Sequence, residues 1–513
     1  MKKTVAILML VTIVSKILGF VRDIVLSYFY GASSISDVYL ISLTIPIVIF
    51  SFIGKGISVG FIPMYTRIES SDGTERANNY ANNVINFVFL ICTIIFIGGM
   101  IFTESIVKLF ASGFKGETLE LTVKFTKITL IGVYFSGLNY VFLAYLQIKG
   151  LFIIPTLMGL PANVIMVASI YASSREGSYT LLAVGSLIAI FSQFLLLFIF
   201  SYKSNYRYKP RLNFKDENIK KMAILALPAI LGTSVIQINL LIDRTLASKI
   251  APGGIAALNY ASTLSVVIIG IFVLSISSVL YPKLSKLSAE NNISELKTVL
   301  SGAISAVNIL VLPAVVGCMI FARPIVEFLY GRGSFDHEAL RMTSSALFYF
   351  SIGIVGLSHR ETLANTFYSL QDTRTPMINA AIAMVLNIIL NLILSKYLGI
   401  GGLALATSIS TIFCTLLLLF NLRKRIGSLG LTKVSFSFIK ILIASLAMGG
   451  LSKFIYHLLL NKFSLDVSLI LSVAVGATVY FIIIFLLRIQ EVQMIFKELK
   501  EKFRPIKETE AAK

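Results

Sequence analysis

Charged side chains inside long apolar segments are the residues of this sequence that could do chemistry. Lys16 and Arg22 lie six residues apart in one such segment. Ser15 precedes the lysine and Asp23 follows the arginine. An ionisable group at bilayer depth costs at least about 2.5–3.5 kcal/mol, so it is by default a candidate functional group. Lys16 has no acid one helical turn away, and we therefore expect it to face a water-filled cavity. The other members of this set are Asp37, Lys55, Asp243, Arg244, His359, Arg360 and Glu361.

The cationic members of this set predict a binding site for an anionic substrate. Arginine matches the geometry of phosphate, and lysine acts as a point charge. Arg360 and Glu361 are adjacent, so we expect them to point to different faces of a helix, with at least one facing the cavity. A simpler interpretation stays open for Arg22 and Asp23, which could neutralise each other near the outer end of their segment. Asp37 is expected to cap its own helix.

A second group combines one acid with neutral oxygens. Asn387 and Asn391 are four residues apart and therefore share one helix face. Asp243 and Thr407 could converge on them from two other apolar segments. One carboxylate with neutral oxygens suits a hard monovalent cation. Hydrogen bonding between membrane helices explains the same residue types, and the residues alone leave both interpretations open.

No enzyme constellation competes with these two groups. The sequence has no Walker loop, no paired carboxylates at a cleft and no Cys/His cluster. The run Gly331-Arg332-Gly333 is too short to cradle a phosphate. The cysteines are far apart, without metal or disulfide spacing. We therefore predict a protein that is not an enzyme and needs no cofactor beyond a possible coupling cation. The cysteines are Cys92, Cys318 and Cys414.

Apolar helices are the elements that must position these residues. Hydrophobic residues make up 56% of the 513-residue chain and charged residues only 14%, whereas soluble proteins carry nearer 25% charged residues. Apolar runs of about 20 residues, long enough to cross a bilayer, recur from end to end. The first run lacks a signal-peptide cleavage site and is predicted to be a membrane helix. The sequence predicts an all-α polytopic membrane protein with fourteen transmembrane helices, near 4–29, 36–62, 82–111, 121–147, 152–173, 179–202, 223–249, 255–281, 298–329, 339–368, 376–397, 401–422, 435–460 and 466–488.

The net charge of +20 is explained by membrane topology rather than by nucleic acid. Lys and Arg gather in the connections near 203–221, 283–297 and 423–425, as the positive-inside rule expects of cytoplasmic loops. Both termini are therefore predicted to lie in the cytoplasm. Lys108 and Lys115, in a connection predicted to lie outside, are the exception. No basic patch interleaved with aromatic residues on a soluble domain indicates nucleic-acid binding.

The chain repeats itself in order. Arg22-Asp23 is echoed by Asp243-Arg244, and the distance from the acid to the proline that ends the following apolar segment is 63 − 23 = 40 residues in the first half and 282 − 243 = 39 in the second. Such a repeat predicts two pseudo-symmetric six-helix lobes and alternating access, with the site at the lobe interface. The predicted parts are an N-lobe at 1–203, a basic cytoplasmic linker at 204–222, a C-lobe at 223–425, two extra helices at 426–490 and a basic cytoplasmic tail at 491–513.

Several longer motifs together resemble one family. The sequence resembles the MurJ/MviN lipid II flippase family of the multidrug/oligosaccharidyl-lipid/polysaccharide exporter superfamily, over nearly the whole chain. The motifs are Ser15-Lys16-Ile17-Leu18-Gly19-Phe20-Val21-Arg22-Asp23, Phe61-Ile62-Pro63, Asp243-Arg244-Thr245-Leu246-Ala247-Ser248, Ala256-Ala257-Leu258-Asn259-Tyr260-Ala261, Gly331-Arg332-Gly333-Ser334-Phe335-Asp336, Phe367-Tyr368-Ser369-Leu370-Gln371-Asp372-Thr373-Arg374-Thr375-Pro376 and Gly399-Ile400-Gly401-Gly402-Leu403-Ala404-Leu405-Ala406-Thr407-Ser408.

The resemblance implies a function and assigns residues to it. Family members flip the undecaprenyl-diphosphate-linked peptidoglycan precursor, lipid II, from the inner to the outer leaflet of the bacterial cell membrane for cell-wall synthesis. A cationic cavity accepts the diphosphate, and a groove at the last two helices is thought to hold the lipid tail. We expect the substrate site to comprise Ser15, Lys16, Arg22, Asp23, Lys55 and Arg360. Matches to a sodium site of the family are Asp243, Asn387, Asn391, Thr407 and the backbone carbonyl of Leu403.

Departures from the family pattern keep other cargoes open. Lys16 replaces a usual arginine, Lys55 stands near but not obviously in place of a usual cation, and Thr263 occupies a position that is usually arginine. The alternatives are an exporter of another polyprenyl-linked oligosaccharide, a cation-coupled exporter of small amphiphiles and a membrane scaffold for envelope assembly. The expected partners are the lipid-linked diphosphate substrate and membrane lipids, and we expect the protein to be a monomer.

Overall fold

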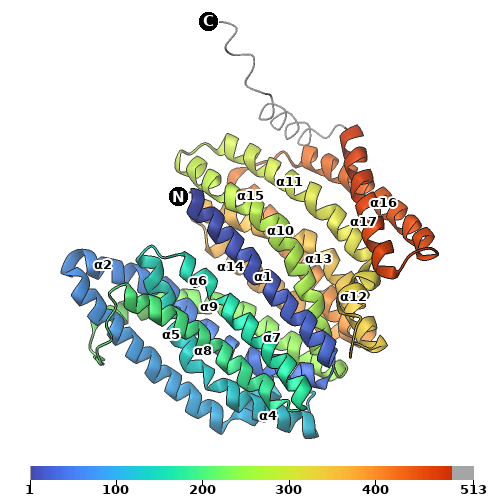
Figure 1. The fold of residues 1–513 in the computed structure, drawn as a ribbon. Helices are drawn as coiled ribbons and strands as arrows, with labels where there is room; N and C mark the ends of the chain where they lie inside the picture. Colours follow the sequence, from blue (N-terminus) through green and yellow to red (C-terminus); the bar gives the residue numbers. More distant parts are fainter. Residues whose placement is uncertain (1, 488–513) are drawn as a thin grey trace, which may run out of the picture. The chain divides into compact units, whose positions relative to one another are not determined.

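The computed structural model of the protein describes residues 2–487, and the predicted tail at 491–513 lies outside the described residues. Within residues 2–487 the chain is entirely helical, apart from turns and connections, with seventeen helices (Figure 1). The helices are α1 (Lys2–Tyr30), α2 (Ser34–Ile101), α3 (Thr103–Phe110), α4 (Gly116–Leu130), α5 (Gly132–Ile148), α6 (Ile153–Leu157), α7 (Gly159–Glu176), α8 (Thr180–Lys203), α9 (Glu217–Ile250), α10 (Gly254–Ala289), α11 (Ile293–Ile320), α12 (Ala322–Tyr330), α13 (His337–Ser369), α14 (Arg374–Leu398), α15 (Ile400–Ile426), α16 (Leu431–Leu460) and α17 (Leu465–Leu486).

Among residues 2–487, fewer helices can cross a membrane than the fourteen predicted crossings, and one part of the difference has a geometric reason. By length and composition, nine helices of the described part can cross a membrane, or up to eleven if each of two bent pairs is one span. Helix α2 is counted once although it has 68 residues. A helix of that length extends about 100 Å, roughly three times a hydrocarbon core. It is broken at Gly73, where φ is 84° and ψ is 169°, and its two halves contain the predicted second crossing and most of the third.

Two prolines that were expected to end apolar segments lie inside helices. Pro63 is within α2 and Pro282 is within α10. A proline removes one backbone donor and kinks a helix, but membrane helices tolerate it where neighbouring groups satisfy the freed carbonyl. The same arrangement at both repeat positions agrees with the internal repeat.

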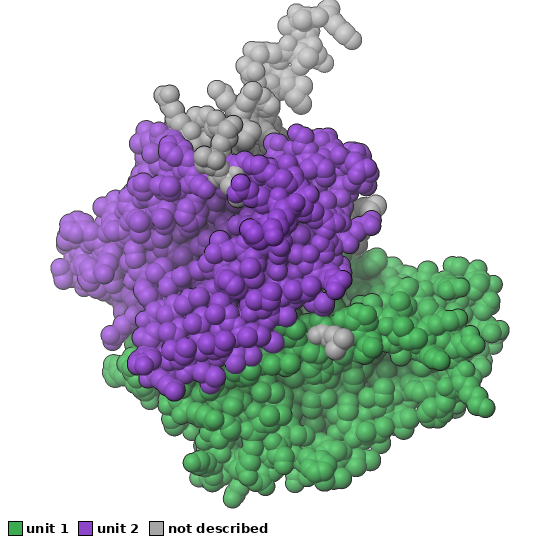
Figure 2. All heavy atoms as spheres, turned by 180° about the vertical axis from the view of Figure 1, so that it is seen from behind, with its two compact units in different colours: residues 1–260, 329–342 green, residues 261–328, 343–513 purple. Residues whose placement is uncertain are grey.

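The chain forms two compact units (Figure 2). Unit 1 comprises Met1–Tyr260 and Leu329–Met342, and unit 2 comprises Ala261–Phe328 and Thr343–Lys513. The division cuts through α10 and α13, and it places all of α9 in unit 1. The predicted lobes, which divide near residues 204–222, follow the sequence repeat instead, and their limits stay a prediction.

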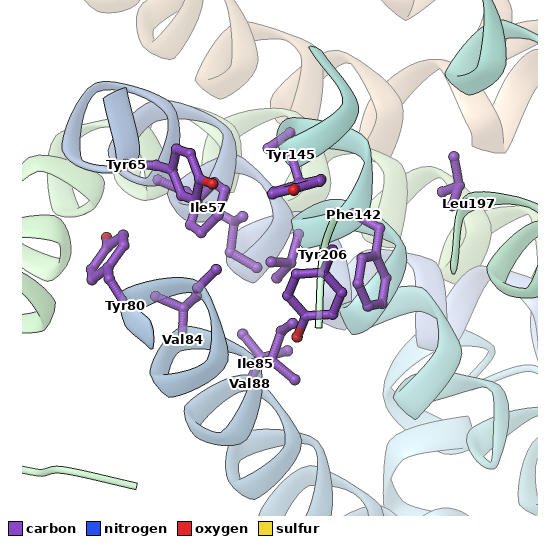
Figure 3. Close-up of a cluster of buried hydrophobic side chains, with 14 of the residues drawn as sticks. Ile57, Tyr65, Tyr80, Val84, Ile85, Val88, Phe142, Tyr145, Leu197 and Tyr206 are labelled. Carbon is purple, nitrogen blue, oxygen red and sulfur yellow. The ribbon is translucent and has the colours of Figure 1, made fainter. Parts of the chain in front are cut away.

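The core of unit 1 forms where α2 packs against α5 and α9. Aromatic rings meet in this core, with the Tyr145 ring 5.6 Å from that of Tyr65 and 5.5 Å from that of Tyr206 (Figure 3). Close helix approach is made possible by glycine, since a Cβ at Gly60 would lie 2.6 Å from the Met222 side chain on α9. Small residues at crossing points are the usual means by which membrane helices pack.

The core of unit 2 is built from α10, α11 and α13, with α16 and α17 packed on α11. Val273, Val311 and Ile354 join the first three helices. Tyr480 of α17 is buried and donates a hydrogen bond to the carbonyl of Ile309 on α11 at 2.6 Å. The last two helices are therefore an integral part of unit 2.

Candidate substrate and ion sites

Arg22 and Asp23 form an ion pair on α1. The distance from Arg22 Nη2 to Asp23 Oδ1 is 2.8 Å, and Nε donates to the same oxygen at 3.1 Å. The Asp23 side chain is 4% exposed, whereas that of Arg22 is 28% exposed. The two charges therefore neutralise each other, and part of the Arg22 side chain stays accessible. A partly exposed guanidinium can still donate to a second anion, because it has five N–H donors.

Lys16 is exposed on α1, while its neighbour Ser15 packs against α7. Asn163 Nδ2 donates to the Ser15 carbonyl at 3.4 Å, and a Cβ at Gly159 would lie 2.1 Å from Ser15 Oγ. Among residues 2–487, no carboxylate lies within ion-pair distance of Lys16. The serine fixes the helix against its neighbour, and the lysine is available to a ligand.

Lys55 is exposed on α2 between two glycines that both face other helices. A Cβ at Gly54 would lie 2.3 Å from the Tyr140 ring of α5, and one at Gly56 would lie 3.1 Å from Ala226 of α9. Because both flanking positions are packed, the lysine between them points away from these contacts. It is a second cation without a carboxylate partner in the described part of the chain.

Asp37 does not cap its own helix, and this expectation was wrong. Ser33 is the N-cap of α2, whereas Asp37 is fully buried and accepts hydrogen bonds from the amides of Gly253 at 2.8 Å and Ala256 at 2.7 Å. The carboxylate therefore caps α10, where the first-turn amides need an acceptor. Arg244 supports the same turn by donating to the carbonyl of Ile255 at 3.1 Å. Sequence reasoning missed this contact because its partners are 216 and 219 residues apart.

In unit 2, the charged ends of the Arg360 and Glu361 side chains approach each other. Arg360 Nη2 lies 3.7 Å from Glu361 Oε1, and their side chains are 37% and 41% exposed. Both side chains are long enough for their charged ends to meet although adjacent residues start from different sides of the helix, so the prediction that at least one faces a cavity stays a prediction. The preceding His359 turns inward, with Nε2 2.9 Å from Asn308 Oδ1 on α11.

The neutral part of the predicted cation site is assembled in unit 2. Asn387 Nδ2 is 3.3 Å from Thr407 Oγ1, and Asn391 Nδ2 donates to Asn387 Oδ1 at 2.8 Å. Thr407 donates to the Leu403 carbonyl at 3.1 Å. The two asparagines are almost fully buried. The arrangement brings together four of the five predicted residues, on α14 and α15.

Asp243, the predicted acidic member, lies on α9 in unit 1. Asn239 Nδ2, one turn earlier, is 3.4 Å from Asp243 Oδ2. Residues 2–487 contain no group of three or more His, Cys, Asp or Glu side chains that could hold a metal ion. An oxygen site for a monovalent cation is the chemistry that these residue types allow.

Comparisons with known proteins match most of the chain. The family model described as lipid II flippase MurJ matches residues 26–474. The chain belongs to the MurJ family of lipid II flippases. A probable lipid II flippase MurJ of Vibrio cholerae serotype O1 is 30% identical over 451 residues, covering 86% of this chain and 85% of the relative. A probable lipid II flippase MurJ of Thermotoga maritima is 27% identical over 503 residues, covering 97% and 98%.

Solved structures give the same result. A lipid II flippase MurJ in an inward closed conformation matches with a TM-score of 0.80 at 27% identity, covering 96% of this chain and 99% of its own. An inward-facing multidrug resistance MATE family transporter matches with a TM-score of 0.71 at 18% identity, covering 81% and 95%, which is a likeness of fold alone. As a member of the MurJ family, the chain is a multi-pass membrane transporter and not an enzyme.

Proposed function

We propose that this MurJ family member moves lipid II from the inner to the outer leaflet by alternating access, as a monomer with fourteen crossings. Both termini would lie in the cytoplasm, as the distribution of Lys and Arg indicates. The internal repeat and the like placement of Pro63 and Pro282 support two lobes of six helices. Such lobes expose a central site to one leaflet at a time.

The diphosphate would be held by Lys16, Arg22 and Arg360, with Ser15, Asp23 and Lys55 around them. The observation that carries this assignment is Lys16, an exposed cation in an apolar helix without a carboxylate partner among residues 2–487. A lone cation at that depth is costly, and an anionic ligand would repay the cost. Arg22 and Arg360 are each paired with the acid beside them, so they would contribute through their exposed N–H groups.

The lipid tail would occupy an apolar cavity of unit 2. This cavity has a volume of about 390 Å³ and lies among α10, α11, α12, α16 and α17. Pro313, Phe321, Met448 and Phe481 are among its lining residues. Hydrocarbon is the ligand that such a lining favours, because burial of apolar surface supplies the binding energy.

A sodium ion bound at the cluster of Asn387, Asn391, Leu403 and Thr407 in unit 2 would drive the return step, and Asp243 of unit 1 is the remaining residue assigned to that ion. Hydrogen bonds link these four residues of unit 2, and the Thr407 hydroxyl oxygen lies 3.1 Å from the Leu403 carbonyl oxygen. The membrane potential is the other available source, since one charge moved through 100 mV supplies about 2.3 kcal/mol.

The test is complementation of a flippase-depleted cell, scored by the accessibility of lipid II on the outer face. Lys16→Ala and Arg22→Ala should lower flipping about 10- to 100-fold, because each removes a charge-assisted contact of about 1.5–3 kcal/mol. Lys108→Ala is the matched control, because it removes a cation that is exposed and paired with Glu104. Normal flipping by both cavity variants at equal protein level would refute the assignment.

Another polyprenyl-linked oligosaccharide stays the second candidate cargo. Thr263 on α10 stands where the family pattern usually has arginine, so the site has one positive charge fewer with which to bind an anion. Competition between lipid II and other diphosphate-linked glycans in purified vesicles would distinguish the two cargoes. Protection of the substrate site by cationic dyes would instead favour an exporter of small amphiphiles.

A further inference from the structure

The segment between α8 and α9 is bound along α2 rather than hanging free. Helix α9 begins at Glu217, where Asp216 Oδ1 accepts from the Asn218 amide at 2.9 Å. The non-helical part is therefore residues 204–216, which we call the strap. Three asparagine side chains of α2 bind its backbone, a pattern that satisfies buried polar groups in an irregular segment. The hydrogen bonds run from Asn82 Nδ2 to Arg207 O (3.1 Å), from Asn83 Nδ2 to Asn213 O (3.2 Å), from Asn213 N to Asn83 Oδ1 (2.8 Å) and from Asn86 Nδ2 to Arg211 O (2.9 Å).

The strap presents cations that differ in how they are engaged. The strap contains four Lys or Arg, and its one acid is Asp216, at the start of α9. The Arg207 guanidinium lies 3.9 Å from the centroid of the Tyr202 ring, and Lys209 is 3.6 Å from a Glu75 carboxylate oxygen. Arg211 and Lys215 are exposed, and neither has a carboxylate within ion-pair distance in the described part of the chain. Two cations are therefore available to an external anion.

Large apolar side chains alternate with these cations on the same segment. Tyr208 is 51% exposed, Leu212 is 47% exposed and Phe214 is 67% exposed. Phe89, on the part of α2 that the strap follows, is also 51% exposed. Aromatic residues interleaved with basic ones are typical of the membrane interface. The contact region of α2 is also where the predicted crossing at 82–111 begins, so we place the strap at the level of the lipid head groups.

Two adjacent hollows lie beside the strap, and both include Asn86 and Phe89. The first, about 460 Å³, is bordered by Arg211 and Leu212 of the strap. The second, about 330 Å³, extends between α2, α5 and α8 and is lined mainly by apolar side chains, with Asn86 and Tyr208 as its polar members. A rim that carries Arg211, with Lys215 four residues further along the strap, thus adjoins a mainly apolar slot. The remaining lining residues of the slot include Leu138, Phe142, Phe194, Phe198 and Tyr208.

We propose that this groove binds an anionic glycerophospholipid of the inner leaflet, with its phosphate at Arg211 and Lys215 and an acyl chain in the slot. A free phosphate would use only the rim, and a zwitterionic lipid would gain little from two unpaired cations. An anionic phospholipid matches both parts, because its phosphate is joined to its chains. Basic pockets between membrane helices on the cytoplasmic side bind such head groups. The assignment to the inner leaflet rests on the proposed orientation of the chain, whereas the lipid binding itself does not depend on lipid II transport.

The bound lipid would also hold the strap against α2. Asn86 connects the two, since its Nδ2 donates to the Arg211 carbonyl and its Oδ1 accepts from the Tyr208 hydroxyl at 2.7 Å. A phosphate at the rim would neutralise cations that otherwise repel one another along the strap. The connection between the two predicted lobes would therefore be ordered by the membrane around it.

The absence of tryptophan from the chain allows a direct test. Phe214→Trp introduces a single indole on the exposed part of the strap, next to the Phe87 ring at 5.0 Å. The purified full chain is reconstituted without substrate or ion gradient in phosphatidylcholine bilayers. Each bilayer contains a fixed fraction of acyl-brominated lipid, either phosphatidylglycerol or phosphatidylcholine. We expect brominated phosphatidylglycerol to quench the indole with an apparent affinity at least fivefold higher, since each cation near an anionic lipid supplies about that factor.

Charge variants decide between a built site and general attraction. The double variant Arg211→Gln, Lys215→Gln should reduce the preference for phosphatidylglycerol over phosphatidylcholine to near one. The double variant Lys220→Gln, Lys221→Gln, on the first turns of α9, should leave this preference above fivefold. Equal quenching by the two lipids, or an equal loss in both double variants, would overturn the proposal. Loss of the preference when inorganic phosphate replaces chloride at constant ionic strength would show a site for free phosphate instead. Lys16→Ala should not change the quenching, so failure of the transport proposal is measured separately.

Discussion

The contact between Asp37 and the start of α10 gives a quantitative prediction. Its carboxylate accepts from the amides of Gly253 and Ala256 at 2.8 and 2.7 Å in a fully buried setting. Asp37→Ala leaves two buried donors without their acceptor, at about 1–3 kcal/mol each. The first turn of α10 should therefore open more easily by about 2–6 kcal/mol. A factor of ten corresponds to 1.4 kcal/mol, so local amide exchange should accelerate at least about 25-fold.

Hydrogen exchange of the solubilised protein, read on peptides covering residues 251–260, measures this opening. Asp37→Asn should have a smaller effect, because its amide retains one acceptor oxygen. Ser33→Ala is the control, because it removes the N-cap of α2 and should accelerate exchange near Ser36 only. Unchanged exchange at 251–260 in Asp37→Ala, or acceleration confined to the start of α2, would refute the reasoning and restore an ordinary local cap.

Three further outcomes are expected. Gly54→Ala should lower the melting temperature, because the new Cβ would lie 2.3 Å from an aromatic ring and overpacking costs about 1–3 kcal/mol; Gly98→Ala, with open space around it, should not. Burial would raise the pKa of Asp372, but hydrogen bonds from the Thr375 amide and hydroxyl and the charge of Arg425 outweigh it and lower the pKa below 3.8. Arg425 should therefore stabilise the folded protein fully above about pH 3.8, the ordinary pKa of the carboxyl group. This stabilisation should disappear as the pH falls through the lower pKa of Asp372 in the folded state. Melting curves of the wild-type protein and of Arg425→Ala against pH would show the difference. Asn387→Leu should abolish any rise in melting temperature with sodium relative to potassium, since a ligand stabilises only a protein that binds it; a persistent sodium effect would place the ion elsewhere.

The candidate sites were predictable to different degrees. Asn387 and Asn391 could be placed together because their spacing of four residues sets one helix face, and the hydrogen bond between them confirms that face. Lys16 is exposed on α1, and the water-filled cavity expected around it stays a prediction. The contact between Arg360 and Glu361 was not predicted, since helical spacing describes where side chains start and not how far long ones bend.

The strap shows why connections are harder to predict than helices. The basic character of residues 204–222 was evident from the sequence, but its last six residues belong to α9. Its contact with α2 depends on Asn82, Asn83 and Asn86, more than 120 residues earlier in the chain. Nothing in the local pattern of either segment identifies the other.

The sequence by itself determined the helices, the apolar class and the family. In a bilayer every backbone hydrogen bond must be satisfied within its own segment, so a long apolar run has one available structure. Most of each predicted range is helical as far as the structure describes it, with breaks at Phe102, Ile131, Met158 and Phe321. Tertiary structure alone decided which helix Asp37 caps and where the strap is held. Those contacts depend on the packing of distant segments, which the charge and spacing of neighbouring residues do not encode.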